Sequence, residues 1–269
     1  MPSDDRIPLR LARAIRRRRS AILLYHGLGD PAPGHDPDNL QVRPQAFGRQ
    51  LDLLLTAGFE FVTVSEFASR IADGRPPAGL VALSLDDGME DNHSVLAPIL
   101  AEYQVPATIY VTTGTIGAAN PFMAPESGAR MMEAGEIAAL AAAGHEIGAH
   151  SVTHPDMSAL GYDECLREMA ESKATVEEIT GTPARAFAYP FGSYGPAAME
   201  AARDAGFATA TTCINRGSWD PYELRRTLIT GRDAMAGFLT RVAGVYEPLV
   251  LGRTGTAARR ATRGLRGRR

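Results

Sequence analysis

Two adjacent carboxylates follow a short apolar run early in the chain. Asp86 and Asp87 lie in the sequence SLDDG at 84–88, directly after β-prone residues at 80–85. Adjacent residues that leave a strand point in different directions, so the two acids can take different chemical roles. Taken alone, the Asp-Asp-Gly sequence also fits a turn or a helix N-terminus, because aspartate and glycine favour turns.

A second cluster contains two histidines four residues apart. His150 and His154 lie in the sequence HSVTH, immediately after a run at 146–149 that we expect to be a strand. If the segment continues as a helix, both imidazoles lie on one face, as paired metal-binding histidines require. Together with Asp87 they predict a divalent-metal site with three protein ligands and open positions for water and substrate. A purely structural histidine pair is the alternative.

A third cluster has the sequence AYPFG at 188–192 and follows another β-rich run. A Pro-aromatic-Gly corner can turn the backbone N–H of Phe191 into a cleft, where it would stabilise an oxyanion. Without a neighbouring catalytic group, the same corner is a tight turn.

The elements that must position these clusters alternate regularly along the chain. We expect strands at 21–25, 60–63, 80–85, 107–112, 146–149, 186–189, 207–211 and 227–230. We expect helices at 44–57, 65–72, 94–103, 135–143, 162–180, 196–205 and 234–243. Repeated βα units predict a parallel sheet, and this many units favour a barrel over an open sheet. The predicted fold class is therefore α/β, a distorted (β/α)7-8 barrel in a single domain, with the three clusters at the C-terminal ends of its strands.

Together, the three clusters resemble the polysaccharide deacetylases that share the NodB homology domain, carbohydrate esterase family 4. SLDDG lies where that family has Thr-Phe-Asp-Asp-Gly, and HSVTH fits its His-(Ser/Thr)-x-x-His pattern. AYPFG fits the Arg-x-Pro-aromatic-Gly pattern, except that Ala188 replaces the arginine. The resemblance covers residues 20–245. Each motif is weak alone, whereas all three in order form a specific signal.

The resemblance assigns roles to these residues. It implies that Asp87, His150 and His154 hold a divalent metal, usually zinc, with cobalt, nickel, manganese or iron as alternatives. Asp86 would be the general base that takes a proton from the attacking water. The N–H of Phe191 would stabilise the oxyanion together with the metal.

The departing amine needs a proton, which most family members supply from a histidine late in the chain. Here the last histidine is His154. A circularly permuted subgroup, similar to the poly-N-acetylglucosamine deacetylases, carries this acid in a Tyr-His pair after the first strand. The sequence LYHG at 24–27 matches that arrangement. The resemblance therefore implies His26 as the general acid, and a capping or core histidine is the alternative.

Four further residues are candidates for binding the substrate or tuning the base. Because Ala188 replaces the arginine that orients the base in the family, Arg226, near the last predicted strand, is the candidate substitute. Trp219 and Asp220 are candidates for the same barrel rim, although Trp219 also fits ordinary packing. Tyr189 is the candidate from the third cluster.

The resemblance implies a metal-dependent hydrolase that removes N-acetyl groups from an N-acetylated amino sugar or polysaccharide. One alternative is a deformylase or deacylase of a lipid-linked or nucleotide-linked amino sugar, using the same site. Another is a carbohydrate-binding homologue whose catalytic site has decayed. The four residues Asp86, Asp87, His150 and His154 together argue against decay.

Charge divides the 269-residue chain into three segments. A basic N-terminal segment at 1–19 carries +5, an arginine-rich tail at 250–269 carries +7, and the barrel at 20–249 carries −15. An acidic barrel excludes nucleic acid as a partner, because phosphate binding needs a cationic face. Ile7, Leu11 and Ile15 recur every four residues among the N-terminal arginines, which suits a short basic amphipathic helix. As a hypothesis, the basic ends contact an anionic membrane surface, and a solvated or disordered tail is the alternative. We find no apolar run that would span a bilayer or form a signal peptide, so we expect a cytoplasmic protein, peripheral at the inner membrane face if its ends bind lipid.

Overall fold

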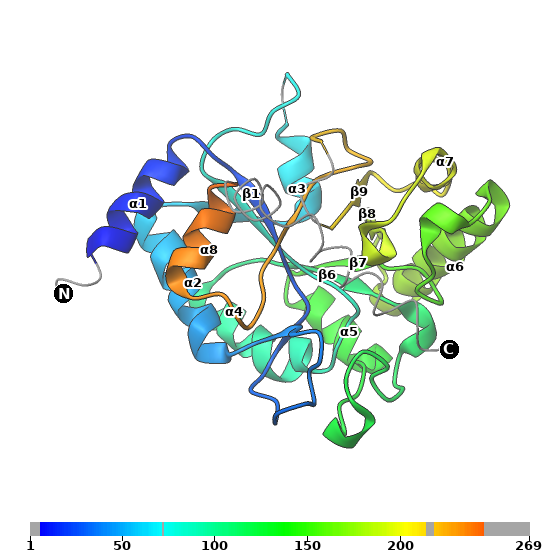
Figure 1. Cartoon of the computed structure of the whole chain (residues 1–269). Coiled ribbons are helices and arrows are strands. Elements are labelled where there is room, and N and C mark those ends of the chain that lie inside the picture. The colour runs from blue at the N-terminus through cyan, green and yellow to red at the C-terminus, as the bar shows by residue number, and fades with distance from the viewer. Residues whose placement is uncertain (1–5, 72, 214–217, 245–269) are drawn as a thin grey trace.

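The computed structural model describes residues 6–71, 73–213 and 218–244, so the arginine-rich tail lies outside the described residues (Figure 1). Its main sheet is parallel and runs in the order β10-β1-β5-β6-β7-β8-β9, with β4 pairing the first half of β5. The strands are β1 (Ala21–Tyr25), β4 (Glu60–Val62), β5 (Leu80–Leu85), β6 (Thr108–Val111), β7 (Glu146–Ala149), β8 (Ala186–Ala188), β9 (Thr209–Thr211) and β10 (Thr227–Leu228). The predicted distorted βα barrel is confirmed. A separate short pair, β2 (Gly27–Leu28) and β3 (Gln41–Val42), was not predicted.

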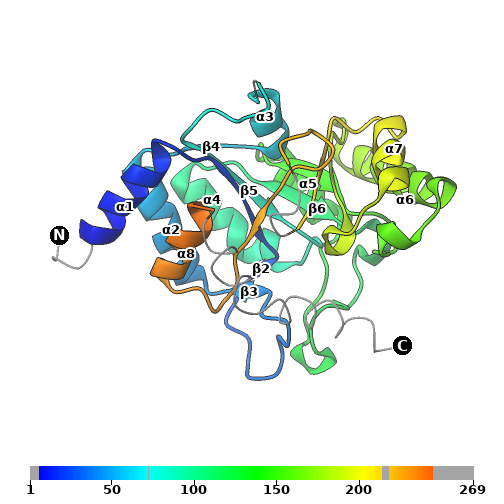
Figure 2. The same cartoon turned by 45° about the horizontal axis from the view of Figure 1, so that its top comes forward.

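The helices surround this sheet (Figures 1 and 2). They are α1 (Arg6–Arg16), α2 (Pro44–Ala57), α3 (Val64–Ser69), α4 (Ala97–Tyr103), α5 (Ala134–Ala142), α6 (Tyr162–Thr180), α7 (Pro196–Asp204) and α8 (Met235–Val242). A π-helical turn precedes α4 at Asn92–Leu96, and 3-10 turns lie at Thr113–Thr115, Pro125–Ser127, Met157–Ala159 and Pro190–Gly192. Among the described helices, none has both the length and the apolar character needed to cross a bilayer.

The bounds of α2 follow directly from its end signals. Pro44 occupies the first helical position, where its missing N–H is not needed. Gly58 ends the helix in the left-handed region, at φ 86°. These signals made 44–57 predictable to the residue.

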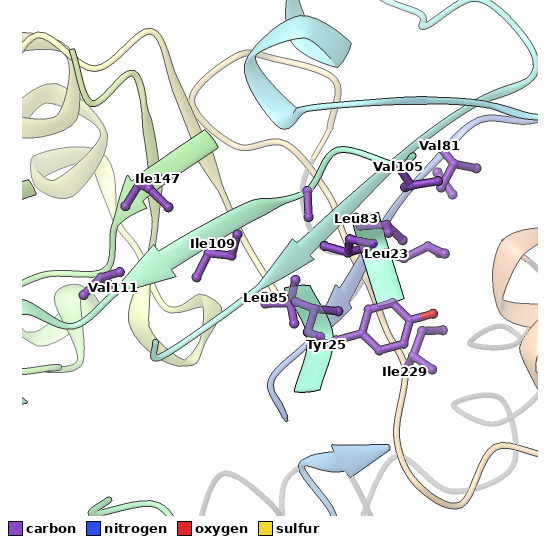
Figure 3. Packing of buried hydrophobic residues seen from close by; sticks show 14 of the residues in the cluster. Leu23, Tyr25, Val81, Leu83, Leu85, Val105, Ile109, Val111, Ile147 and Ile229 are labelled. Carbon is purple, nitrogen blue, oxygen red and sulfur yellow. The ribbon is translucent and has the colours of Figure 1, made fainter. Parts of the chain in front are cut away.

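The central strands β1, β5 and β6 are buried on both faces. On the helix-facing side, Leu23 pairs with Leu83 and Tyr25 pairs with Leu85, within the main hydrophobic cluster shown in part in Figure 3. The alternating residues of these strands, such as Ile22, point to the other face and form smaller clusters inside the barrel. Both faces are apolar because helices cover one side and the opposite wall covers the other.

The segment from Leu224 to Leu228 completes the barrel wall. At its start, the N–H of Leu224 bonds the carbonyl of Ala210 in β9 at 3.0 Å. At its end, Thr227 and Leu228 pair with β1. The chain thus crosses from the last strand of the sheet to the first, and Arg226 lies at the crossing.

Candidate metal centre and catalytic site

The two adjacent aspartates leave β5 at the C-terminal edge of the barrel, and both are buried. The N–H of Asp86 still bonds the carbonyl of Tyr25 at 3.1 Å, so Asp86 extends the β1–β5 pairing by one residue. Asp87 adopts a left-handed backbone, with φ 75°. Both carboxylates lie near Nε2 of His150, at 3.9 Å for Asp86 and 3.5 Å for Asp87.

Asp87, His150 and His154 converge on one point. Oδ1 of Asp87 lies 3.5 Å from Nε2 of His150 and 3.5 Å from Nε2 of His154. One ligand atom from each residue lies within 4.8 Å of the other two. Nδ1 of His150 lies 2.7 Å from the carbonyl of Ala188, a partner that fixes the ring and leaves Nε2 for a metal. One carboxylate oxygen and two imidazole nitrogens fit a catalytic divalent-metal site with open positions.

The segment 150–154 does not continue as a helix, which was the condition under which the sequence placed both imidazoles on one face. Ser151 and His154 have positive φ values of 65° and 58°, so the segment forms a turn. The hydroxyl of Ser151 accepts the N–H of His154 at 3.0 Å. Local side-chain hydrogen bonding of this kind competes with helix formation, and the turn itself brings the two imidazoles together.

Glu168 of α6 anchors this histidine turn, and the sequence analysis missed it. Its carboxylate accepts the N–H groups of Val152 and Thr153 at 2.8 and 2.9 Å. It also accepts the hydroxyl of Thr153 at 2.8 Å. The available signal was a carboxylate at a position of α6 that the helical period places on the buried face.

A second acidic cluster lies outside this site. Glu90, His93 and Glu136 also bring potential ligand atoms within 4.8 Å. Arg130 occupies this cluster, however, with Nη2 at 2.6 Å from Glu136 and 3.5 Å from Glu90. The guanidinium of Arg130 therefore already provides the positive charge that these carboxylates would otherwise take from a metal ion.

Arg226 binds Asp86 in a buried, two-pronged ion pair. Nη1 and Nη2 lie 2.6 and 2.7 Å from the two carboxylate oxygens. The arginine is 0% exposed, and its Nε donates to the carbonyl of Thr212 at 2.7 Å. Its guanidinium lies 5.4 Å from the ring centre of Tyr110, which belongs to the same interior cluster as Ala188. The structure thus places Arg226 against the candidate base Asp86. The guanidinium lies in the barrel interior, near the cluster that contains Ala188.

The ionisation of the site follows from this pairing. Burial alone would raise the pKa of Asp86, but the charges of Arg226 and His150 outweigh it and lower the pKa to about 2. Burial is likewise outweighed at Asp87, whose pKa is lowered by the hydrogen bond from His150 and by His26 and His154. Burial lowers the pKa of His154 to about 4, so this ring is neutral at pH 7 and can bind a metal. At His150 the two aspartates outweigh burial and raise the pKa.

Aromatic rings border His154. Phe122 and Phe191 lie edge-on to its imidazole, with ring centres at 5.0 and 4.6 Å. Phe191 is 37% exposed and has a left-handed backbone, with φ 59°. The side-chain ring of Phe191 therefore lies beside the histidine turn. Phe122, from the loop after β6, was not predicted.

His26 follows β1 at the same edge of the barrel. Its charge contributes to lowering the pKa of both Asp86 and Asp87, which places the imidazole within the site. Nδ1 of His26 is buried and has no hydrogen-bond partner among the described residues.

A polar network fixes the backbone around His26. The carbonyl of His26 accepts Nδ2 of Asn92 at 2.9 Å. The carboxylate of Asp91 accepts the N–H of Leu28 at 3.1 Å and Nε2 of Gln41 at 2.8 Å. These bonds tie the segment after β1 to the residues that follow the aspartate pair. Sequence reasoning missed this network because its members lie in three separate segments.

Three of the four further candidates are not brought to the site. Trp219 packs against Phe67 of α3 at 5.5 Å, in the interior cluster at the opposite end of the barrel. Asp220 caps the N–H of Tyr222 at 2.8 Å in the same loop region. Tyr189 is buried on the helix-facing side, where its hydroxyl donates to the carbonyl of Tyr222 at 3.0 Å. The expected rim positions of Trp219 and Asp220 are therefore corrected, and Tyr189 is a packing residue.

The sequence profile of one known family, described as polysaccharide deacetylase, matches residues 73–210, just over half of the chain. The chain belongs to the polysaccharide deacetylase family. This membership agrees with the site, because the matched region contains Asp86, Asp87, His150 and His154.

Individual relatives of this family member are distant. It is 25% identical to YxkH of Bacillus subtilis over 192 residues, which are 71% of this chain and 63% of YxkH. It is 27% identical to a chitooligosaccharide deacetylase of Sinorhizobium fredii over 144 residues, which are 52% of this chain and 59% of that protein. The chain thus spans less than two thirds of the length of these curated relatives.

Solved structures share the fold. The deacetylase PplD of Streptococcus pyogenes, solved in complex with acetate, is 25% identical, with a TM-score of 0.71 over 83% of this chain and 98% of that one. IcaB of Ammonifex degensii is 24% identical, with a TM-score of 0.69 over 84% of this chain and 97% of that one. The curled barrel is therefore the fold of known deacetylases.

Proposed function

We propose that this protein is a metal-dependent hydrolase that removes N-acetyl groups from an amino sugar within a glycan. The observation that carries the proposal is the group Asp87, His150 and His154, of which the first two are buried, beside the ion-paired carboxylate of Asp86. The chitooligosaccharide deacetylase and the acetate-bound deacetylase among its relatives support the same reaction class.

The metal that fits this donor set best is zinc, because zinc favours histidine nitrogen and carboxylate oxygen in sites that keep open positions. Cobalt, nickel, manganese and iron accept the same ligands. When bound, such a metal supplies Lewis acidity, which polarises a carbonyl and acidifies water.

The chain's own residues supply the proton transfers. Asp86 takes a proton from the attacking water, and Arg226 fixes both oxygens of its carboxylate in place. The N–H of Phe191 donates to the oxygen of the acetamide carbonyl as negative charge develops there. His26 then donates a proton to the departing amine, which would otherwise leave as a strongly basic anion.

Within the family, we propose a place near the poly-N-acetylglucosamine deacetylases, because the acid lies after the first strand. A poly-beta-1,6-N-acetyl-D-glucosamine N-deacetylase of Staphylococcus aureus supports this grouping, at 32% identity over 82 residues, which are 30% of this chain. The expected substrate is therefore an oligomer of N-acetylglucosamine.

The test is release of acetate and of free amine from β-1,4- and β-1,6-linked N-acetylglucosamine oligomers, with zinc or cobalt added. We expect equal amounts of both products, and greater turnover on the β-1,6 series. Asp86→Asn should bind metal but release neither product, which controls for contaminating hydrolases. A metal-loaded protein that releases no acid or amine from any acylated sugar would contradict the proposed function.

A further inference from the structure

Helix α1 presents an apolar strip to solvent on the flank of the barrel. Its inner side is anchored, since Ala12 and Ile15 are buried and the helix packs beside α2 and α8 (Figures 1 and 2). Ile7 and Leu11 are nevertheless 73% and 47% exposed. They are four residues apart, so they form one strip roughly a quarter turn from the buried side. A folded helix with a second, uncovered apolar strip needs a reason beyond packing.

Arginines border this strip on the side away from the barrel. Arg10 and Arg13 in α1, and Arg17 in the turn directly after it, are exposed. In the part of the chain that the structure describes, no carboxylate forms an ion pair with any of the three. The first turn of α1 also lacks acidic residues. The outer surface of the helix therefore combines exposed apolar side chains with arginines that have no carboxylate partner among the described residues.

We propose that α1 binds the surface of an anionic lipid bilayer. Ile7 and Leu11 enter between the lipid headgroups, and the arginines contact the phosphates. An apolar strip bordered by cations is the pattern of helices that lie in the membrane interface. A free polyanion would pair the arginines but leave the two apolar side chains in water, so lipid satisfies both features.

The packing of α1 makes this contact useful to an enzyme. Because Ala12 and Ile15 fasten the helix to α2 and α8, the barrel cannot rotate freely about its anchor. Docking would therefore hold the barrel in a fixed orientation to the surface. The residues of α1 are separate from the proposed catalytic residues, so membrane binding and hydrolysis can be tested independently.

The first test is co-sedimentation of the full chain with vesicles of phosphatidylcholine alone or with one quarter phosphatidylglycerol, at about 0.1 M salt. We expect binding to the anionic vesicles about tenfold stronger or more than to the neutral ones. Ile7→Ser with Leu11→Ser should weaken anionic binding by about fivefold or more. Leu55→Ser on α2, which removes a residue 37% exposed elsewhere, should leave binding unchanged.

The second test separates the arginines of α1 from total charge. The triple variant Arg10→Gln, Arg13→Gln and Arg17→Gln should weaken binding by about tenfold or more, since each arginine contributes near such a surface. A matched triple variant that removes the same charge elsewhere should bind as the wild type does. Its exposed arginines are Arg75, Arg167 and Arg185.

Three results would overturn the proposal. One is equal binding to neutral and anionic vesicles. Another is anionic binding that survives the serine double variant, because the apolar strip would then have no role. The third is equal loss in the two arginine variants, which would indicate a nonspecific charge effect. Circular dichroism of each variant would confirm that α1 changes have not unfolded the barrel.

Discussion

Replacing Arg226 with alanine is expected to lower kcat/KM for deacetylation by about 10²- to 10⁴-fold, the range associated with a general base. Both guanidinium nitrogens bond the Asp86 carboxylate inside the barrel, so the variant leaves a buried carboxylate without its partner. Removing one member of such a pair also destabilises the fold, by about 3–5 kcal/mol. Chemical denaturation and steady-state kinetics of Arg226→Ala would measure the two losses separately.

The pH profile distinguishes loss of the base from general damage. In the intact protein the pKa of Asp86 is about 2, so its ionised form is fully present above the ordinary carboxyl pKa and is lost only as pH falls through about 2. Without Arg226, burial is no longer outweighed to the same extent, and the pKa rises. The acid limb of kcat/KM should therefore shift to higher pH in Arg226→Ala. An unshifted limb would contradict the assignment of Arg226 as the partner of the base.

Placing an arginine at position 188 in the Arg226→Ala variant tests the role of Arg226 by recovery of activity, not only by its loss. Ala188 and Tyr110 belong to one interior cluster, and the guanidinium of Arg226 lies over Tyr110. An arginine at position 188 would therefore enter the region that Arg226 now fills. We expect Ala188→Arg to restore part of the activity of Arg226→Ala and to return the acid limb toward low pH. Ala188→Arg in the otherwise intact protein should be destabilising, because the interior is already filled.

Replacing His26 with alanine should lower kcat for amide hydrolysis by about 10²- to 10⁴-fold while metal binding persists. The departing amine needs a proton, whereas the departing phenolate of an activated acetyl ester does not. His26→Ala should therefore retain hydrolysis of 4-nitrophenyl acetate to within about threefold. The ratio of ester to amide turnover is the quantity to measure.

A matched histidine variant makes this ratio decisive. His93 lies in the outer groove between α4 and α5, away from the proposed site, so His93→Ala should leave the ratio unchanged. An equal loss of ester and amide turnover in His26→Ala would contradict the role of His26 as an acid. Such a result would instead indicate that His26 orients the substrate or the base.

The sequence predicted the barrel because its signals were local and repeated. Pro44 and Gly58 bound α2, and alternating strands and helices implied the parallel sheet. The convergence of Asp87 with His150 was also predictable, since the ends of parallel strands meet at one edge of the barrel. The route by which His154 joins them was not predictable from a helical period, because Ser151 bonds the backbone locally and the segment 150–154 forms a turn.

Long-range contacts were harder to predict than local structure. Arg226 reaches Asp86 only because the segment from Leu224 closes the wall between β9 and β1. Trp219 was expected at the barrel rim, but the loop that precedes Leu224 places it against Phe67, at the opposite end of the barrel. Glu168 was overlooked because a carboxylate in a helix usually faces solvent, and its three bonds to the histidine turn cannot be inferred from spacing.

The most direct test of the account is the metal content of the purified chain, measured by mass spectrometry beside Asp87→Ala and Glu136→Gln. We predict about one equivalent of divalent metal in the wild type, since one site offers three convergent ligands. Asp87→Ala should lose both the metal and the deacetylase activity. Glu136→Gln, in the cluster that Arg130 already fills, should keep both. Full metal content in Asp87→Ala would contradict the central claim that Asp87, His150 and His154 form the metal centre. Loss of the metal from Glu136→Gln, with the metal retained in Asp87→Ala, would contradict it as well.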